Sequence, residues 1–312
     1  MGSTPITSTG KPIADDAIES VAIFDANNRA IQDGSAVLPI YSLTKTFIAA
    51  TVIAAKINLS SPISRWFDSH WVPRGADINV AQLLSHQSGI RDYFSGSTAY
   101  SEAVARASQT KQQNNQPTKT WSDDTYADHT LRQPLWFEPG TSFGYSNPGY
   151  WLLVEILQKE TDRSLAELIN SYISRPLELE SVSLAEGLFA NDLPHYSAGW
   201  VWHGLLLASA TDVARFMASP LIEPLRTHLV AVVGDQPGWQ KPHYGYGLMV
   251  EPGERFGHNG DGPVFSAACY KFQKSGHTLC VLKRTRDLDS EPDAKEVDGA
   301  AMHRLLALHA QL

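Results

Sequence analysis

The sequence of 312 residues contains no long apolar run, only two cysteines and no excess of positive charge. No run approaches the ~20 consecutive apolar residues that a membrane-spanning helix needs, so we expect no membrane span. The net charge of −8 at pH 7, without any basic patch, argues against nucleic acids and anionic membrane surfaces as partners. Hydrophobic residues make up 43% of the chain and charged residues 19%, which excludes wholesale disorder and indicates a globular protein with a sizeable core.

The first ten residues lack the basic segment followed by an apolar segment that marks a signal peptide. A secreted chain trimmed of its leader would look the same, so a cytoplasmic location and a mature secreted or periplasmic form both stay open. Internal repeats, glycine-rich phosphate loops and clustered metal ligands are also missing, and the eleven histidines are scattered. We therefore expect neither a metal ion nor an organic cofactor.

The two cysteines, Cys269 and Cys280, lie on either side of a predicted hairpin turn at residues 273–276. With Gln273 opposite Gly276, the antiparallel register places the cysteines opposite each other. They can form a cross-strand disulfide in an oxidising compartment or remain a pair of buried thiols. This register puts them at a hydrogen-bonded pair, whose spacing suits a disulfide less well, so we favour thiols.

Predicted strands occur near both ends of the chain. Residues 19–25 and 35–41 are apolar stretches on either side of a turn at 26–29. Glycine and proline turns separate further strands in the C-terminal third, and an amphipathic helix closes the chain. These strands are at 246–250, 255–258, 264–272 and 277–284, and the helix is at 298–312.

Helical patterns fill the middle of the chain. Residues 44–56 are good helix formers and apolar almost all round, which predicts a buried central helix. Residues 149–176 are predicted to form two helices, of which the second begins with a capping box of Ser164 and Glu167. Residues 107–120 are polar and aperiodic, which predicts a surface loop.

This order of elements predicts an α/β (α+β) fold. One antiparallel sheet takes its strands from both termini and is flanked by helices, and a mostly helical lobe is inserted between them. We expect residues 1–60 and 236–312 to form the sheet lobe and 61–235 the inserted lobe. Together they would make one discontinuous catalytic unit.

An S-x-x-K box, Ser42-Leu-Thr-Lys45, stands at the start of the predicted central helix. Residues three apart share one face of a helix, so we expect the Lys45 amine beside the Ser42 hydroxyl. Free backbone N–H groups in the first turn of a helix favour negative charge, as a developing oxyanion requires. The arrangement is typical of serine acyl-transfer sites in which lysine, rather than histidine, lies beside the nucleophile.

Further motifs follow this box in an order that is specific for one family. They are Leu83-Leu-Ser-His-Gln-Ser-Gly89, Phe137-Glu-Pro-Gly-Thr141, Tyr145-Ser-Asn147, Ser209-Ala-Thr-Asp-Val-Ala-Arg-Phe216, Tyr246-Gly-Leu and Gly257-His-Asn-Gly-Asp-Gly262. From about residue 20 to 285 the chain resembles the serine hydrolases related to class C β-lactamases, D-Ala-D-Ala peptidases and their esterase and D-aminopeptidase relatives. The resemblance implies a β-lactamase/transpeptidase-like fold and a serine acyl-enzyme. It also implies a small ester, amide or short peptide as substrate.

The resemblance also implies roles for residues of the first two boxes. Ser42 would be the nucleophile and Lys45 its proton acceptor, which requires that burial lower the lysine pKa from about 10.4. Tyr145 would be the second member of the proton relay. Asn147 would bind the substrate carbonyl and steady Lys45. The structural alternatives for these four residues are a helix N-cap serine, a surface lysine, a core tyrosine and a turn asparagine.

The third box, His258-Asn259-Gly260, is expected to line the cleft. His258 would touch the substrate or the relay tyrosine, with a structural strand histidine as the alternative. Gly260 would keep the strand edge free of a side chain, so that a substrate can lie against it. The backbone N–H groups of Ser42 and Asp261 are implied as the oxyanion hole.

The third box departs from the pattern of the penicillin-recognising members. β-Lactamases and penicillin-binding peptidases of this family usually carry Lys-Thr/Ser-Gly there, and the lysine helps to hold the substrate carboxylate. Here His258 supplies a mostly neutral imidazole and Asp261 adds a negative charge, so we expect neutral esters or amides to be preferred over penicillins. Among the other polar residues, His86 is interpreted as structural, and no motif assigns a role to His203.

Three alternatives stay open from the sequence. The first is a β-lactamase or D-Ala-D-Ala carboxypeptidase, and the second is an acyl transferase that uses an alcohol acceptor. The third is a non-catalytic binding protein on the same fold. The natural substrate, its stereochemistry and the oligomeric state depend on pocket shape and surface contacts that the sequence does not specify.

Overall fold

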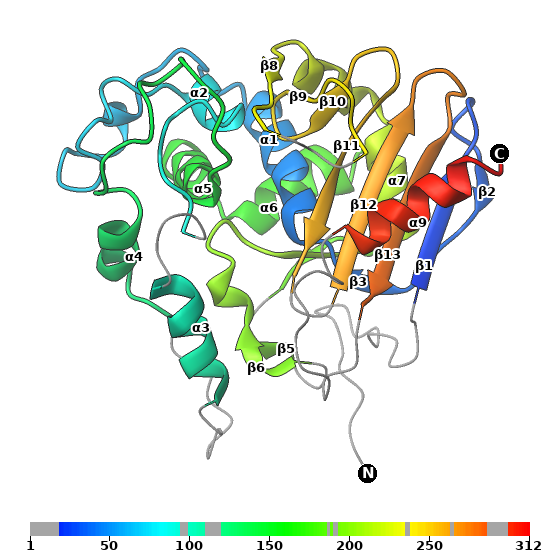
Figure 1. Ribbon diagram of the computed structural model, residues 1–312, viewed down its shortest axis with the longest axis horizontal. Coiled ribbons are helices and arrows are strands. Elements are labelled where there is room, and N and C mark those ends of the chain that lie inside the picture. Colours follow the sequence, from blue (N-terminus) through cyan, green and yellow to red (C-terminus); the bar gives the residue numbers. More distant parts are fainter. Residues whose placement is uncertain are drawn as a thin grey trace.

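The computed structural model describes residues 19–93, 99–109, 120–185, 188–189, 193–234, 238–262, 265–285 and 299–312. An eight-stranded antiparallel sheet fills one side of the molecule (Figure 1), in the order β2-β1-β13-β12-β11-β10-β9-β8. Its strands are β1 (Glu19–Phe24), β2 (Ala30–Gln32), β8 (Val230–Ala231), β9 (His243–Tyr244), β10 (Met249–Glu251), β11 (Arg255–Asp261), β12 (Phe265–Phe272) and β13 (Thr278–Arg284). Because β1 pairs with β13, strands from the two ends of the chain meet in one sheet, as the sequence predicts.

Helices cover both faces of this sheet. α9 (Ala300–His309) packs on β12 and β13, and α7 (Ala210–Ala218) packs on β1, β12 and β13 from the opposite side. Side chains alternate between the faces of a strand, so Ala268 and Tyr270 of β12 face α9 whereas Cys269 faces the main core. Although α7 comes from the segment predicted as the inserted lobe, it packs on the sheet. The division of the chain into two lobes stays a prediction.

The other described elements are short strands and helices. The strands are β3 (Val37–Pro39), β7 (Leu206–Ser209) and β4 (Ser183–Leu184) in one sheet, and β5 (Leu188–Phe189) and β6 (Leu193–Ser197) in another. The α-helices are α1 (Thr44–Ala54), α2 (Val80–Leu84), α3 (Ala99–Gln109), α4 (Asp123–His129), α5 (Asn147–Thr161) and α6 (Leu165–Ile169). The remaining helical segments are the 3-10 helices η1 (Tyr41–Leu43), η2 (Ile63–Arg65), η4 (Ala198–Trp200) and η5 (Pro220–Arg226) and the π-helical turn η3 (Asn170–Ser174). Within the described ranges, no helix has the length and apolar character needed to cross a membrane.

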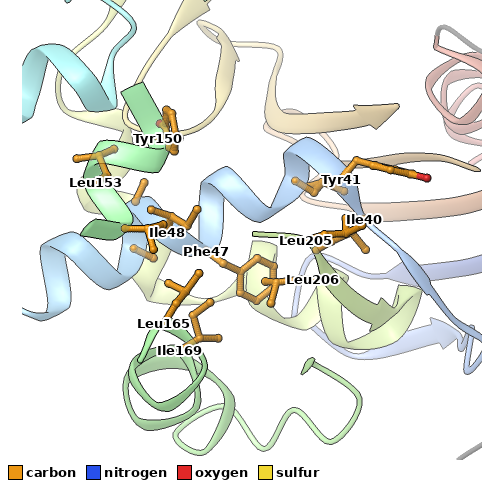
Figure 2. Packing of buried hydrophobic residues seen from close by; sticks show 14 of the residues in the cluster. Ile40, Tyr41, Phe47, Ile48, Tyr150, Leu153, Leu165, Ile169, Leu205 and Leu206 are labelled. Carbon is orange, nitrogen blue, oxygen red and sulfur yellow. The ribbon is translucent and has the colours of Figure 1, made fainter. Parts of the chain in front are cut away.

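α1 is the buried central helix that the sequence predicts. Nine of its eleven residues, from Thr44 to Val52, are buried. Figure 2 shows Phe47 and Ile48 among side chains of α5, α6 and the β7 segment. Phe47 also stacks on Phe216 of α7, with 4.0 Å between the ring centroids. Because neighbours enclose α1, its polar residues are removed from water along with its apolar ones.

Two of the strand predictions are wrong in detail. The strand that follows the turn at 26–29 is β2, which pairs with β1, whereas Val37–Pro39 pairs with β7 in a different sheet. The strand predicted at 246–250 begins only at Met249. Gly247 has a φ of 74°, and its carbonyl accepts a hydrogen bond from the Thr46 hydroxyl, so this part of the chain turns onto α1 instead.

The helical predictions are confirmed with shifted boundaries. α5 begins two residues early, because Ser146 is its N-cap and its hydroxyl accepts from the Gly149 N–H. The capping box of Ser164 and Glu167 is present at the start of α6, which runs directly into the π-helical turn η3. Of the loop predicted at 107–120, the first three residues belong to α3 and residues 110–119 lie outside the described ranges.

Cys269 and Cys280 face each other across β12 and β13, as predicted, and both are free buried thiols. Their hydrogen-bonding position, however, was predicted wrongly. The Phe272 N–H donates to the His277 carbonyl at 2.8 Å, so the turn contains four residues instead of two. Hydrogen-bonded and non-hydrogen-bonded pairs alternate along an antiparallel ladder, and the cysteines lie three pairs away from Phe272 and His277. They therefore occupy a non-hydrogen-bonded pair. Burial raises the pKa of the Cys269 thiol well above its ordinary value, which keeps it protonated.

Candidate active site

Ser42 lies in η1, the helical turn that leads directly into α1. The residue before it, Tyr41, has a φ of 41°, in a left-handed region that a tyrosine rarely adopts. The Tyr41 ring packs over Gly262, where an added Cβ would lie 2.1 Å from the ring. This contact ties the Ser42 turn to the end of β11. Backbone strain of this kind is maintained only where the surroundings enforce it, and it is common at functional sites.

Two side chains reach the Ser42 hydroxyl. The Lys45 Nζ lies 3.0 Å from the Ser42 Oγ, and the Tyr145 hydroxyl donates to the same oxygen at 2.9 Å. Lys45 comes from the next turn of the same helical run, as the spacing predicts. Tyr145 comes from the segment before α5, and only the tertiary fold brings it here. The three polar groups form one compact cluster.

Burial controls the charge of this cluster. Lys45 is fully buried, and this lowers its pKa to about 7 although the Asp92 carboxylate opposes the shift. A large fraction of Lys45 is therefore neutral near pH 7, and its amine then has a lone pair. Burial also raises the pKa of Tyr145 well above its ordinary value, and the bond to Ser42 only partly offsets this effect. Tyr145 therefore remains a hydrogen-bond donor.

An aromatic cage positions Tyr145. The His86 ring lies against it with 4.3 Å between centroids, and the rings of Tyr150 and Tyr244 also pack on His86, with centroids 5.1 and 4.7 Å from its own. The His86 Nδ1 accepts from the Ser146 N–H at 3.1 Å, which fixes the backbone directly after Tyr145. Burial lowers the pKa of His86 well below its usual value, so the ring is neutral. These contacts support the structural interpretation of His86.

His258 lines the pocket, but its hydrogen-bond partner is Tyr244 instead of Tyr145. Its Nε2 lies 2.9 Å from the Tyr244 hydroxyl, and its Nδ1 faces the Asn259 carbonyl. Burial lowers the pKa of His258 to about 3, so the imidazole is neutral. The position that carries a lysine in penicillin-recognising relatives thus has no cation here.

β11 brings the third box against the Ser42 turn. An added Cβ at Gly260 would lie 2.0 Å from the Ile40 carbonyl and 3.0 Å from the Ser42 nitrogen. The prediction that Gly260 leaves room for a substrate is therefore wrong, because the space is filled by the backbone before Ser42. The Gly262 N–H donates to the Phe265 carbonyl on β12. Since N–H groups alternate along a strand, the Asp261 N–H points away from β12, towards the Ser42 side.

A pocket of about 420 Å³ opens above Ser42. Six of the eight predicted site residues line it: Ser42, Tyr145, Asn147, His258, Asn259 and Asp261. Of the other two, Lys45 is buried beneath the pocket and Gly260 packs against Ile40. Among the described residues, no arginine or lysine lines this pocket. Nor do these residues include a group of three or more His, Cys, Asp or Glu side chains that could hold a metal ion.

The sequence analysis missed one buried polar residue of the site, Asp92, and assigned no role to another, His203. Asp92 lines the pocket and accepts from the Asn147 N–H at 2.8 Å. Its place three residues after the Leu-Leu-x-His-x-Ser-Gly motif was the available signal. His203 lies behind Lys45, with its Nε2 3.2 Å from the Lys45 Nζ. No local pattern marks His203, because the contact joins residues 158 apart in the chain.

Solved structures share this fold. The D-amino acid amidase from Ochrobactrum anthropi SV3 superposes with a TM-score of 0.71 at 19% identity, over 94% of this chain and 93% of that one. A D-stereospecific amidohydrolase from Streptomyces sp. gives 0.68 at 20% identity, over 93% and 95%. The fold is that of the β-lactamases and penicillin-binding proteins, as expected from the sequence.

The sequence comparisons identify the family. The family model described as Beta-lactamase matches residues 7–300, so the chain belongs to the beta-lactamase family. It is 34% identical over 108 residues to a D-aminopeptidase of Gluconobacter oxydans (strain 621H), a match over 34% of this chain and 18% of that protein. A D-aminopeptidase of Brucella ovis is 28% identical over 177 residues, which cover 55% of this chain and 31% of the relative. The chain thus spans a third or less of these curated relatives.

Proposed function

We propose that the protein is a serine hydrolase that cleaves an ester or amide bond through an acyl-enzyme on Ser42. One observation carries the proposal. The Ser42 Oγ lies within hydrogen-bond distance of both the Lys45 Nζ, at 3.0 Å, and the Tyr145 hydroxyl, at 2.9 Å. A hydroxyl is a weak nucleophile by itself, and a neighbouring neutral amine that accepts its proton activates it.

Each step of the proposed reaction uses a group of this cluster. Lys45 accepts the Ser42 proton as Oγ attacks the substrate carbonyl, and the Ser42 and Asp261 N–H groups stabilise the oxyanion. Tyr145 protonates the leaving group and is reprotonated from Lys45. Water then attacks the acyl-enzyme, and its proton returns to Ser42 through the same relay. Asn147 binds the substrate amide or carbonyl at the edge of the pocket.

The proposal is tested with a short-chain p-nitrophenyl ester and a fluorophosphonate probe. The wild-type protein is expected to hydrolyse the ester and to gain the mass of one phosphonyl group on the Ser42 peptide. Ser42→Ala is expected to lose both properties while it keeps its unfolding transition. Equal turnover by the two proteins would refute the proposal. Labelling without turnover would indicate a narrower substrate range.

The charge of the pocket points to a substrate that carries an ammonium group. Asp92 and Asp261 present carboxylates to the pocket, and Asp92 is almost fully buried. Among the described residues no arginine or lysine lines this pocket, so its carboxylates favour a cationic group on the substrate. We therefore propose amides or esters of amino acids with a free α-amino group. The D-aminopeptidases and the D-amino acid amidase to which the chain is similar make the D enantiomer the first to test.

Part of the pocket lining is apolar. Phe143, Val232, Trp239 and Met249 contribute side chains to it. Burial of an aromatic or aliphatic substrate side chain against such a wall is favourable by roughly 25 cal/mol per Å². The proposed acyl group thus combines an ammonium with an apolar side chain.

Asp92→Asn tests the substrate class, because the amide oxygen still accepts from the Asn147 N–H. For D-phenylalanine p-nitroanilide we expect kcat/KM to fall about 10- to 100-fold, the effect of losing one charge-assisted bond. The N-acetylated p-nitroanilide, which has no ammonium, should be hydrolysed equally by both proteins. Equal losses on the two substrates would contradict ammonium recognition without affecting the acyl-enzyme proposal.

A further inference from the structure

His203 is a buried imidazole in contact with Lys45 that the proposed reaction leaves without a role. It is 2% exposed, and its Nε2 lies 3.2 Å from the Lys45 Nζ. The other imidazole nitrogen, Nδ1, has no hydrogen-bond partner among the described residues. A native fold seldom leaves a buried polar atom unpaired, and such atoms tend to occur where function demands them.

The turn that carries His203 is fixed from both sides. The Gly204 N–H donates to the Val201 carbonyl at 2.8 Å, and Gly204 has a φ of 89°, which favours glycine. Trp202 stacks on the Tyr126 ring with 3.9 Å between centroids. The imidazole therefore does not reach Lys45 from a free loop.

The same turn is also tied to the segment that contains Ser42. Just after it, the Leu206 carbonyl accepts from the Ile40 N–H at 3.0 Å, and the Leu206 N–H donates to the Thr44 hydroxyl at 3.1 Å. These two bonds lie on either side of Ser42 in the sequence. The His203 turn and the turn that carries Ser42 are therefore held together, so the distance between the imidazole and the Lys45 amine is kept constant.

The chemistry of the amine decides how this contact is used. A neutral amine has one lone pair and two N–H groups. To accept the Ser42 proton, its lone pair must point at the Ser42 Oγ, so the bond to His203 must use an N–H of Lys45. The His203 Nε2 is then the acceptor, and the imidazole proton lies on Nδ1.

We propose that His203 is a positioning residue: its Nε2 accepts a hydrogen from the Lys45 amine and thereby aims the amine lone pair at the Ser42 hydroxyl. The proposal rests on the proposed function of the Ser42 site. When the Ser42 O–H bond breaks and the proton joins the Lys45 nitrogen, the same imidazole lone pair accepts from the new ammonium. No additional reactant is involved, and the proton later leaves Lys45 through Tyr145.

The charge state of the imidazole supports this arrangement. Burial and the neighbouring Lys45 lower the pKa of His203 well below its usual value, so the ring is a neutral acceptor. The rings of Tyr145 and Tyr150 lie 5.0 and 5.7 Å from the Lys45 Nζ. The remaining groups that act on Lys45 or His203 from the packed elements are Ser42, Asp92, His86 and His258.

The test compares His203→Met, which fills the space without a strong acceptor, with His203→Gln, whose amide oxygen can replace Nε2. The pH profile of kcat/KM is measured with p-nitrophenyl acetate. A neutral acceptor favours the ammonium form of Lys45, so removing it should move the acid limb to lower pH by about one unit. The plateau should fall about 10- to 100-fold. His203→Gln should restore both values to within a few-fold of the wild type.

His277→Met is the matched control. His277 also has a buried Nδ1 without a partner among the described residues. It lies at the turn between β12 and β13, however, at the opposite end of β12 from Ser266, which pairs with Asp261 of the pocket. Its replacement should leave the acid limb and the plateau unchanged.

Several results would overturn the proposal. An unshifted acid limb with a lowered plateau in His203→Met would indicate a merely structural histidine, and a limb moved to higher pH would indicate a cationic one. If His203→Met does not unfold cooperatively, a neutron structure of the wild type at pH 8 decides. A hydrogen on Nδ1 and none on Nε2 is expected, and the reverse would refute the proposal. If Ser42→Ala loses turnover but His203→Met has the wild-type pH profile, only this inference is refuted. If the wild type itself is inactive, the proposed function is refuted.

Discussion

At the scale of single residues, the arrangement around Ser42 depends on a lysine that is buried in surroundings that disfavour its charged form. Lys45 is fully buried among aromatic rings, next to a serine and a histidine, and the charge of Asp92 only partly offsets the effect of burial on its pKa. The fold thereby produces a neutral base at a pH where an exposed lysine would be charged. The same burial must lower the free energy of unfolding of the protein.

Lys45→Met is expected to stabilise the protein while it abolishes ester hydrolysis. Because the folded pKa is about 7 and the ordinary value 10.5, the unfolded state binds more protons between these limits. The wild type therefore gains stability as the pH rises through this window, and the penalty of Lys45 is largest at pH 7 and below. At pH 6 the variant should exceed the wild type by about 1–4 kcal/mol in the free energy of unfolding, measured with urea. The gain should shrink towards pH 10. A variant less stable than the wild type at pH 6 would contradict this account.

His258→Lys tests the meaning of the third box. The neutral imidazole of His258 bonds to Tyr244, and no arginine or lysine lines the described part of the pocket. A lysine here would supply a cation for a substrate carboxylate. We expect the rate of Ser42 acylation by benzylpenicillin to rise at least about tenfold, as one charge-assisted bond implies, with hydrolysis of p-nitrophenyl acetate changed only a few-fold. No change in either rate would mean that the box does not select against carboxylates.

At the scale of elements, the site forms where the η1 turn meets the end of β11. Two glycines allow this contact: Gly260 lies against the Ile40 carbonyl and Gly262 lies under the Tyr41 ring. The S-x-x-K spacing predicts that Lys45 lies beside Ser42, because both are in one helical run. It does not predict how closely a strand more than 200 residues later in the sequence approaches the same turn.

Gly260→Ala is expected to separate these two elements. The added methyl group would lie 2.0 Å from the Ile40 carbonyl, and a backbone atom cannot rotate away as a side chain can. We expect kcat/KM for p-nitrophenyl acetate to fall at least about 100-fold, because displacement of an oxyanion donor costs this much.

The control for this prediction is Gly149→Ala. An added Cβ at Gly149 meets its nearest neighbour at an ordinary 3.6 Å, and the position lies inside α5. Alanine is favoured over glycine in a helix, so this variant should keep its activity and gain up to about 1 kcal/mol in stability. A Gly260→Ala protein as active as the control would show that the close approach is not needed.

At the scale of the whole molecule, the packed core keeps the two cysteines from contact with solvent. Cys269 and Cys280 are 0% exposed between the sheet and α7, and the Cys269 Sγ lies 3.8 Å from the Val213 carbonyl. Native protein is expected to react with less than about 0.1 equivalent of dithionitrobenzoate, because a buried protonated thiol is inert. Two equivalents should react in guanidinium chloride without reductant. If no thiol reacts after unfolding, the pair is a disulfide.

Much of the fold follows from local and periodic patterns in the sequence. The buried helix from Thr44, the capping box at Ser164, the long strands of the C-terminal third and the pairing of Cys269 with Cys280 depend on neighbours along the chain or on one hairpin. The short strands were less predictable. Val37–Pro39 has no sequence feature that distinguishes the predicted pairing with β1 from the observed pairing with β7, because partner choice depends on where α1 directs the chain.

The sequence by itself determined the family, the order of the motifs and the presence of Ser42, Lys45 and Tyr145 in a common pattern, since these depend on residue type and spacing. Only the tertiary structure decided which groups act on Lys45 and what fills the pocket. Asp92 and His203 approach the site from segments that have no common motif. The Tyr244 hydroxyl is hydrogen-bonded to the Nε2 of His258, and the Ile40 carbonyl fills the space beside Gly260. Contacts between distant segments are set by the packing of whole elements, and burial, which sets the charge of Lys45, exists only once that packing is complete.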